Sequence, residues 1–297
     1  MMKKIKILTF LFVAAIGASC SSSDDSEAVN PTVDSTDYFN HSSNGQVVAI
    51  SQWTAIRIED HFEVLGQTAL NSSMYLSFNK YGDLERAGTT SVPGSGTPWR
   101  NSAYDFSQNT FDFQILGIDE VNKVIKLSYS GKVYEDEYDI TDSDFETVAG
   151  TVNVHYTNGF TDVAGVSFSA KIAGTDWYGV KMYTTSNGEI SNMKMVYNND
   201  DKNQLAVYLN KFDTAVGTYT FTANSSNNKV VYSVYDTATK EYVDYKCAGT
   251  FTLTEKIESS FGSGTLFAGT FNLTATHPVT NAVVQITAGT FKEISTY

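Results

Sequence analysis

The fold can be predicted from the stretch Ala268-Gly269-Thr270-Phe271-Asn272-Leu273-Thr274-Ala275, near the end of the chain. Apolar and polar residues alternate in it, and alternation at a period of two places one face of a β-strand in a core and the other in solvent. The same Ala-Gly-Thr-Phe start occurs at 248–251 and at 288–291. Glycine is typical of a bulge or a tight strand start, so we expect three structural strands that begin alike.

Similar alternation recurs along most of the chain and indicates a protein built from β-strands. Aromatic residues are abundant, with 18 Tyr and 18 Phe, whereas only 4 Pro are present. The clearest further runs are Met74-Leu76-Phe78, Phe111-Phe113-Ile115, Ile125-Leu127-Tyr129, Val152-Val154-Tyr156, Val166-Phe168-Ala170-Ile172, Met193-Met195-Tyr197 and Tyr219-Phe221-Ala223. Residues 205–212 fit a helical and an alternating spacing, and we assign them to a strand. Short turn signals between the runs predict an all-β, antiparallel β-sandwich-like or open-barrel fold.

Internal repetition predicts that the fold occurs twice. Phe39 and Gly45 match Phe168 and Gly174, and the offset between matching positions grows by about ten towards the end of each copy, which predicts an insertion in the second. The later matches are Phe111 and Phe113 with Phe251 and Leu253, Gly131 with Gly269, and residues 149–152 with 288–291. We therefore predict two tandem domains, 38–157 and 163–297, joined by 158–162; chance similarity between β-sequences is the alternative.

The second predicted domain resembles a known domain family. The motifs are Phe168-Ser-Ala-Lys171 with Gly174 and Trp177, the strand Val216-Gly217-Thr218-Tyr219, and the three Gly-Thr-Phe strands of 249–291. They are similar to a domain family of unknown function that is common in bacteroidete-type surface lipoproteins. The first copy departs from the pattern at Val48 and Val152. The resemblance implies a β-rich fold and an exported protein, and it transfers no catalytic residue.

The first 19 residues have the features of an export signal. Lys3, Lys4 and Lys6 precede an apolar run over 7–16, and small residues precede Cys20. This run is shorter than the ~20 residues of a membrane-spanning helix. Gly17-Ala18-Ser19-Cys20 resembles a bacterial lipobox in which Gly17 replaces the usual Leu. The resemblance implies that Cys20 is acylated and that several acyl chains anchor the protein in the membrane; plain secretion is the alternative.

Residues 20–37 contain little that could pack, so we predict a disordered acidic tether. The segment Ser21, Ser22, Ser23, Asp24 and Asp25 resembles the export signal of bacteroidete-type lipoproteins. The resemblance implies a lipid-anchored protein of the outer membrane that faces the cell surface. A solubilising linker on a periplasm-facing protein is the alternative interpretation.

Charge and cysteine content limit the function classes. Loss of the three signal lysines takes the net charge from −13 to −16, which makes nucleic acid an unfavourable partner. With Cys20 acylated, Cys247 is the one remaining cysteine, so no intrachain disulfide can form. Its apolar surroundings predict a buried thiol on a strand.

No motif identifies a reaction, a metal or a cofactor. The four histidines are dispersed, and paired-Cys zinc spacing, P-loops and Gly-x-Ser-x-Gly elbows are absent from the sequence. The acidic run over 135–146 could supply calcium ligands, but it lacks the glycine and closing glutamate of an EF-hand loop, so we interpret it as a solvated hairpin. A hydrolase would need paired carboxylates that face one cleft.

We therefore expect a non-catalytic binding or structural module of the outer envelope, with a glycan or a protein as ligand. The alternative is a carbohydrate-binding lipoprotein that uses exposed aromatic residues. Trp99 and Arg100 are the candidates, because they follow a Pro- and Gly-rich loop and an indole face can stack on a sugar ring. Three Asp-Ser/Thr-small triplets resemble an O-glycosylation signal of the same class of bacteria; they begin at Asp34, Asp213 and Asp236.

Overall fold

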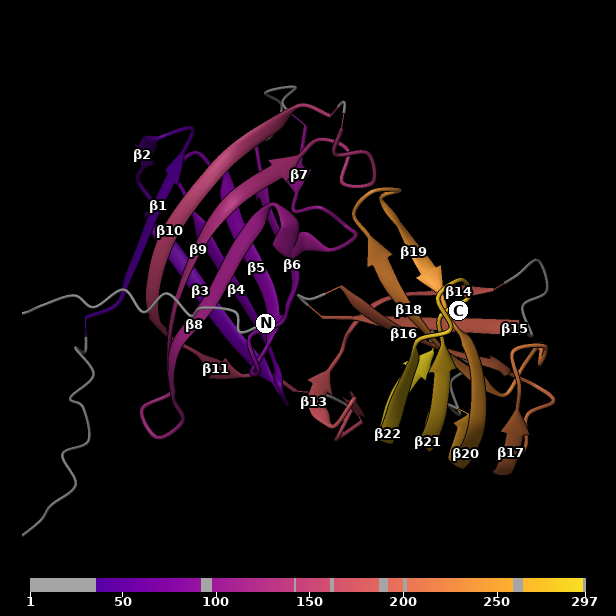
Figure 1. The fold of residues 1–297 in the computed structure, drawn as a ribbon. Helices are drawn as coiled ribbons and strands as arrows, with labels where there is room; N and C mark the ends of the chain where they lie inside the picture. Colours follow the sequence, from indigo (N-terminus) through magenta and orange to yellow (C-terminus); the bar gives the residue numbers. More distant parts are fainter. Residues whose placement is uncertain are drawn as a thin grey trace, which may run out of the picture. The chain divides into compact units, whose positions relative to one another are not determined.

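The computed structural model describes residues 36–91, 98–141, 143–160, 163–186, 192–199, 202–258 and 264–295. These residues belong to one compact unit and consist almost entirely of β-strands, with one single-turn 3-10 helix at Ser107–Asn109. Figure 1 shows strands throughout the described chain. The predicted all-β fold is confirmed. Cys20 and the segment Ser21–Asp25 lie outside the described residues, as does the predicted signal of 1–19.

The first half, residues 36–160, forms one sheet. Its order is β11-β3-β4-β5-β6-β7-β9-β10-β1-β2, with β8 also paired to β9. The strands are β1 Tyr38–Ser43, β2 Gln46–Val48, β3 Gln52–Ile58, β4 His61–Gln67, β5 Ser73–Asn79, β6 Leu84–Thr90, β7 Arg100–Asn101, β8 Phe111–Asp119, β9 Val124–Tyr134, β10 Phe145–His155 and β11 Thr157–Asn158. Among the described strands of this sheet, only β11 pairs in parallel, with β3. Asn158, which we assigned to a linker, lies in β11 and therefore belongs to this sheet.

The second half, residues 163–295, forms two antiparallel sheets. Their orders are β13-β12-β22-β21-β20-β17 and β14-β15-β16-β18-β19. The strands are β12 Ser167–Ile172, β13 Thr175–Tyr178, β14 Val180–Ser186, β15 Asn192–Asn198, β16 Asn203–Asn210, β17 Gly217–Phe221, β18 Lys229–Asp236, β19 Glu241–Asp244, β20 Lys246–Glu258, β21 Thr265–Thr276 and β22 Val283–Ser295. Residues 205–210 lie in β16, so the assignment of this ambiguous segment to a strand is confirmed over those residues.

The strand order of the first half recurs in the second. The series β8-β9-β10-β1-β2 corresponds to β20-β21-β22-β12-β13, and β3-β4-β5-β6-β7 corresponds to β14-β15-β16-β18-β19. Phe39 pairs with Val152 as Phe168 pairs with Phe291, which agrees with two of the matches read from the sequence. The boundaries of two separate domains stay a prediction.

Three of the sequence matches are wrong, two of them by two residues and one by four. Leu127 pairs with Val152 as Gly269 pairs with Phe291, so Leu127 and not Gly131 is the counterpart of Gly269. Phe113 pairs with Tyr129 as Phe251 pairs with Phe271, so Phe113 and not Phe111 is the counterpart of Phe251. Paired β-strands admit a slip of two residues without changing which face a side chain occupies, and the alternation alone therefore cannot detect it.

The extra residues of the second half lie between β16 and β18. The corresponding connection in the first half, between β5 and β6, is a short turn, whereas the second half places β17 there and pairs it with β20. The two opening hairpins keep the same turn, with positive φ at Asn44 and Gly45 and at Ala173 and Gly174. Two consecutive residues with positive φ are typical of the tight type I′ hairpin turn.

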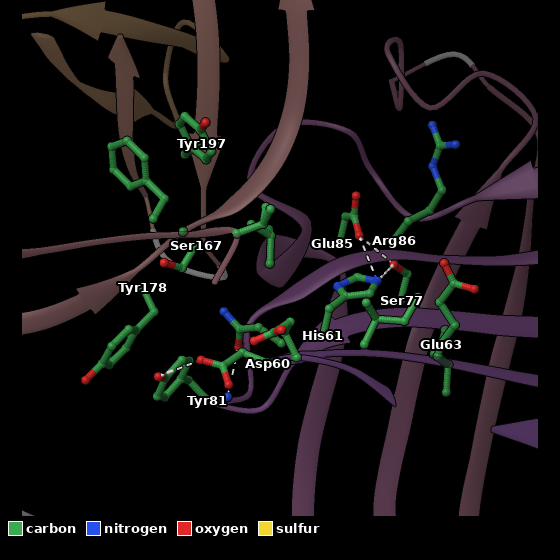
Figure 2. A pocket seen from close by; sticks show the side chains of 18 of the residues that line it. Asp60, His61, Glu63, Ser77, Tyr81, Glu85, Arg86, Ser167, Tyr178 and Tyr197 are labelled. Atoms are coloured by element: carbon green, nitrogen blue, oxygen red, sulfur yellow. Dashed lines mark hydrogen bonds and ion pairs between the residues drawn. The ribbon is translucent and has the colours of Figure 1, made fainter. Parts of the chain in front are cut away.

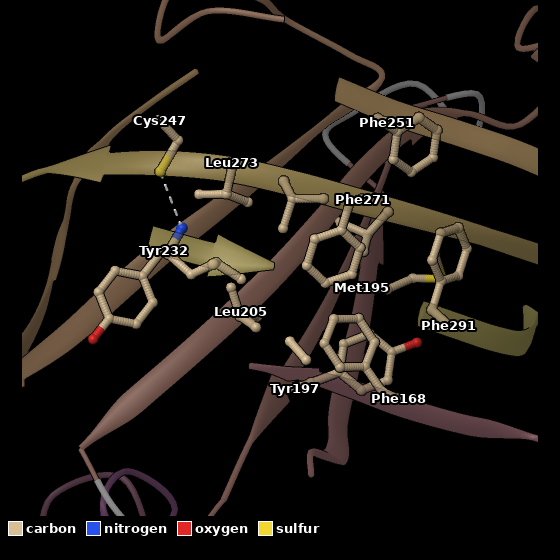
Figure 3. Close-up of a cluster of buried hydrophobic side chains, with 14 of the residues drawn as sticks. Phe168, Met195, Tyr197, Leu205, Tyr232, Cys247, Phe251, Phe271, Leu273 and Phe291 are labelled. Atoms are coloured by element: carbon tan, nitrogen blue, oxygen red, sulfur yellow. Dashed lines mark hydrogen bonds between the residues drawn. The ribbon is translucent and has the colours of Figure 1, made fainter. Parts of the chain in front are cut away.

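Each half has its own hydrophobic core. In the first half, Phe62, Leu76 and Phe78 of β4 and β5 pack with Leu127 and Val152 of β9 and β10. In the second half, side chains of the two sheets meet, and Figure 3 shows the rings that carry this contact. These are Phe168, Tyr197, Phe251, Phe271 and Phe291, with Phe168 stacked on Tyr197 at 3.9 Å between ring centroids.

Cys247 is a buried member of the second core, as predicted. It is 3% exposed and lies on β20. The amide N–H of Tyr232 donates to its Sγ, and the thiol donates to the carbonyl oxygen of Tyr245, both at 3.3 Å. Burial raises the pKa of the thiol to about 11, which keeps it protonated and unreactive at neutral pH.

Candidate functional site

A large cleft lies between the two halves. Its volume is about 1040 Å³, and residues of both halves line it. The first half contributes the outward-facing side chains of β3–β6 and the β9–β10 loop, and the second contributes β12, the end of β13 and parts of β15 and β22. Figure 2 shows His61, Ser77 and Glu85 on one side and Ser167, Tyr178 and Tyr197 on the other. Ligand sites typically have volumes of about 300–1,000 Å³.

The alternation of β4 and β5 explains why polar groups face this cleft. Phe62 and Val64 point into the first core, so their neighbours His61 and Glu63 point outwards. On β5, Phe78 is buried and its neighbour Ser77 faces the same side as His61. The core of the first half therefore fixes the positions of the cleft side chains.

Ser77, His61 and Glu85 form a hydrogen-bonded group on this wall. Ser77 Oγ donates to Glu85 Oε2 at 2.6 Å and lies 3.1 Å from His61 Nε2. The same His61 nitrogen is 3.5 Å from Glu85 Oε2. In a serine hydrolase the acid holds the far nitrogen of the histidine and the serine proton faces the near one. Here both contacts involve Nε2, so the geometry favours a polar binding surface over an activated nucleophile.

Glu137 reaches the cleft from the loop between β9 and β10. It is 8% exposed. Arg86 Nη2 donates to its Oε1 at 2.6 Å, while Oε2 is buried and accepts no hydrogen bond from any described residue. Buried polar atoms nearly always have a hydrogen-bond partner, and a charged one without a partner is costly. Glu137 therefore places a buried carboxylate, with one oxygen paired to Arg86, in the wall of the cleft.

Tyrosines form much of the remaining wall. Tyr81 of the first half stacks on Tyr178 of the second, with ring centroids 3.6 Å apart and planes at 4°. The Tyr81 hydroxyl donates to Asp60 Oδ2 at 3.0 Å, and Lys80 Nζ lies 2.7 Å from Asp60 Oδ1. Burial and the Asp60 carboxylate raise the pKa of Tyr81, and burial raises the pKa of Tyr75 to about 12. These phenols are neutral donors at physiological pH.

Glu293 closes the side of the cleft formed by the second half. It is 6% exposed, and the fully buried Tyr197 donates to its Oε2 at 3.2 Å. Burial, together with this carboxylate, raises the pKa of Tyr197 well above its ordinary value. The hydrogen bond from Tyr197 therefore links Glu293, a carboxylate that lines the cleft, to the core of the second half.

The predicted residues Trp99 and Arg100 lie elsewhere, at the end of the first half. Trp99 is 68% exposed. Arg100 lines a second pocket of about 300 Å³, named here the His41 pocket, whose other walls are mostly hydroxyl-bearing side chains. These are Ser43, Thr68, Ser72, Ser73, Thr89, Thr90 and Ser91, together with His41 and Glu146. The Nε of Arg100 is buried and contacts no acceptor among the described residues.

His41 is held firmly inside this second pocket. It is 6% exposed, and its Nδ1 lies 2.9 Å from the Tyr129 hydroxyl. Burial lowers the pKa of His41 despite the opposing charge of Glu146. Ser43 donates to one Glu146 oxygen, and Thr89 to the other at 3.4 Å. A neutral imidazole beside hydroxyl groups suits a polar, uncharged ligand.

The acidic run over 135–146 is dispersed in the structure. Glu137 faces the cleft, Glu146 faces the His41 pocket, and Glu135 lies 3.9 Å from Arg100. Asp136 instead holds the turn by accepting from the amide of Tyr138 at 2.9 Å. The run does connect a hairpin, β9–β10, but its interpretation as solvated is wrong for Glu137. The described residues contain no group of three or more His, Cys, Asp or Glu placed to hold a metal ion.

The cleft residues escaped the sequence interpretation because no local motif links them. His61, Ser77, Arg86, Glu137 and Tyr178 come from separate strands and loops. The one sequence signal for them was the set of polar residues in each alternating strand. These residues indicate which face of the sheet points outwards, but not which part of the protein lies opposite that face.

Within the described residues, no helix is long and apolar enough to cross a membrane. Comparison with known protein families, curated proteins and solved structures finds no match to this chain.

Proposed function

We propose that the protein is a non-catalytic binding module of the outer envelope, anchored by acylated Cys20, whose ligand occupies the cleft between the two halves. The cleft is the observation that carries this proposal. It has the size of a ligand site, both halves line it, and it contains the buried, half-satisfied carboxylate of Glu137.

Blocking the cleft tests the proposal. Ser167 is exposed and lines the cleft, so Ser167→Trp should fill part of it without disturbing a core. Thr220→Trp is the matched control, because Thr220 is exposed on β17 of the same sheet and does not line the cleft. We expect a thermal-shift screen with oligosaccharides, oligoamines and short peptides to give a stabilising ligand for the full-length protein. Ser167→Trp should abolish that shift, and Thr220→Trp should keep it.

The anchor has its own test. Cys20→Ala should release the protein from the membrane fraction, because without acyl chains the protein loses its proposed hydrophobic anchor. Replacing Asp24 and Asp25 with Ala should reduce digestion of the protein on intact cells. Unchanged membrane attachment of Cys20→Ala would contradict the proposed anchor.

A second candidate function is carbohydrate capture at the His41 pocket. The specific observation is that Arg100 joins a wall of hydroxyl groups, with the exposed indole of Trp99 beside it in the chain. Hydroxyl groups and a guanidinium can bind sugar hydroxyls, and an indole face can stack on a sugar ring. A glycan array on the full-length protein and on Trp99→Ala tests this function separately from the cleft.

A further inference from the structure

The charge of the cleft indicates what kind of ligand it takes. The described residues that line it include six carboxylates and one guanidinium, a formal charge of −5 with His61 neutral. The carboxylates are Glu59, Asp60, Glu63, Glu85, Glu137 and Glu293. Walls of one sign raise the local concentration of ligands of the opposite sign. Anionic ligands are therefore disfavoured and cationic ones favoured.

Several of these carboxylates already have partners, and others do not. Asp60 is paired with Lys80, and Glu85 and Glu293 accept from Ser77 and Tyr197. Glu59 and Glu63 are exposed and form no ion pair with a described residue. The uncompensated charge thus lies on β4 and its preceding turn.

Glu137 supplies an observation independent of the charge count. Glu137 lines the cleft, and its Oε2 is buried without a hydrogen bond from a described residue, although Arg86 donates to Oε1. An ammonium group has three donors and a compact positive charge, and its hydrogen bond to a carboxylate is charge-assisted. Tyr75 and Tyr104 also line the cleft, and the face of a phenol ring attracts a cation.

The carboxylates are distributed over successive strands. Glu63 is on β4 and Glu85 on β6, with β5 between them. Neighbouring strands lie about 4.8 Å apart, so these two strands lie about 10 Å apart. A single ammonium group cannot reach both, whereas an extended molecule with several can.

We propose that the ligand of the cleft is an oligoamine or another extended molecule that carries two or more ammonium groups, which pair with the carboxylates of the cleft wall, Glu137 among them. This inference rests on the proposed function, since it names the ligand class of the same cleft. Uncharged sugars of similar size would leave the negative wall uncompensated.

Calorimetric titration of the full-length protein with spermidine tests the inference, with maltotriose as the uncharged probe. We expect one spermidine per protein, with an affinity that falls as salt is added. Glu137→Gln should weaken binding at least about tenfold, because it removes a charge-assisted hydrogen bond. Glu63→Gln should weaken it less and, being exposed, keeps the test valid if Glu137→Gln does not fold. The matched control is Glu241→Gln, an exposed glutamate outside the cleft.

Three results would overturn the inference. Equal weakening by Glu241→Gln would show that spermidine responds only to the overall charge of the protein. Binding of maltotriose at the cleft without binding of spermidine would refute the cationic ligand while leaving the proposed function intact. Failure of every probe to bind, with Ser167→Trp behaving like the unmodified protein, would count against both.

Discussion

The ion pair between Arg86 and Glu137 in the cleft wall can be tested without a ligand, by measuring how much it contributes to the free energy of unfolding. The Glu137 side chain is 9% exposed and that of Arg86 is 44% exposed. Breaking a fully buried ion pair costs about 3–5 kcal/mol, and an exposed pair contributes about 0.2–1 kcal/mol. Solvent screens the exposed half of Arg86, so we expect Arg86→Met to lower the free energy of unfolding by about 2 kcal/mol. Methionine keeps most of the apolar stem, so the loss reports the charge.

Urea unfolding of the full-length protein, followed by circular dichroism, measures this change. Glu137→Gln should cost about 1 kcal/mol, because the amide oxygen still accepts from Arg86, and the double variant gives the coupling energy. The control is Lys171→Met, whose partner Asp176 is exposed on the other half, and it should cost less than about 0.5 kcal/mol. A cost for Arg86→Met no larger than for Lys171→Met would refute a buried, charged Glu137.

Further predictions concern the cores and the second pocket. Gly289→Ala would place a Cβ against the buried ring of Phe271; we expect a loss of about 1–3 kcal/mol in urea unfolding, whereas Gly117→Ala, with open space around it, should change little. The pKa of the Cys247 thiol in the folded protein, about 11, lies above its ordinary value of 9.0 because the thiol is buried. Its contribution to stability is therefore present below pH 9 and is lost as the pH rises towards 11. The stability difference between the unmodified protein and Cys247→Ala should therefore fall by about 2 kcal/mol between pH 8 and pH 10.5, and a constant difference would contradict a buried thiol. Trp99→Ala should abolish any signal on a glycan array without lowering the melting temperature, and an unchanged array signal would remove Trp99 from that site.

The cores could be predicted from the sequence because alternation is a local signal. Phe271 and Leu273 alternate with polar residues, and both are buried in the second core. The matching of Phe111 with Phe251 was less secure, since a slip of two residues preserves the buried face. The position of β17 required the pairing of strands, which alternation does not report.

The cleft could not be predicted because its residues meet only through the tertiary fold. Glu137 belongs to an acidic run that is typical of a solvated hairpin, yet Arg86 of β6 and the β9–β10 loop enclose it. Tyr81 and Tyr178 lie almost a hundred residues apart in the chain and still form a stacked pair. By contrast, the sequence could indicate Trp99 and Arg100 as candidate sugar-binding residues, because the Pro- and Gly-rich loop before them is a local feature. In the structure Arg100 lines a pocket wall, and the neighbouring Trp99 is exposed to solvent.

Hydrogen–deuterium exchange of the full-length protein with and without spermidine tests the central claim most directly. A ligand in the cleft should slow exchange in both halves at once, in β4–β6 and the β9–β10 loop of the first half and around β12 and β13 of the second. Exchange in β17, which does not line the cleft, should stay unchanged. Protection confined to one half, or spread evenly over the protein, would contradict a ligand site between the halves.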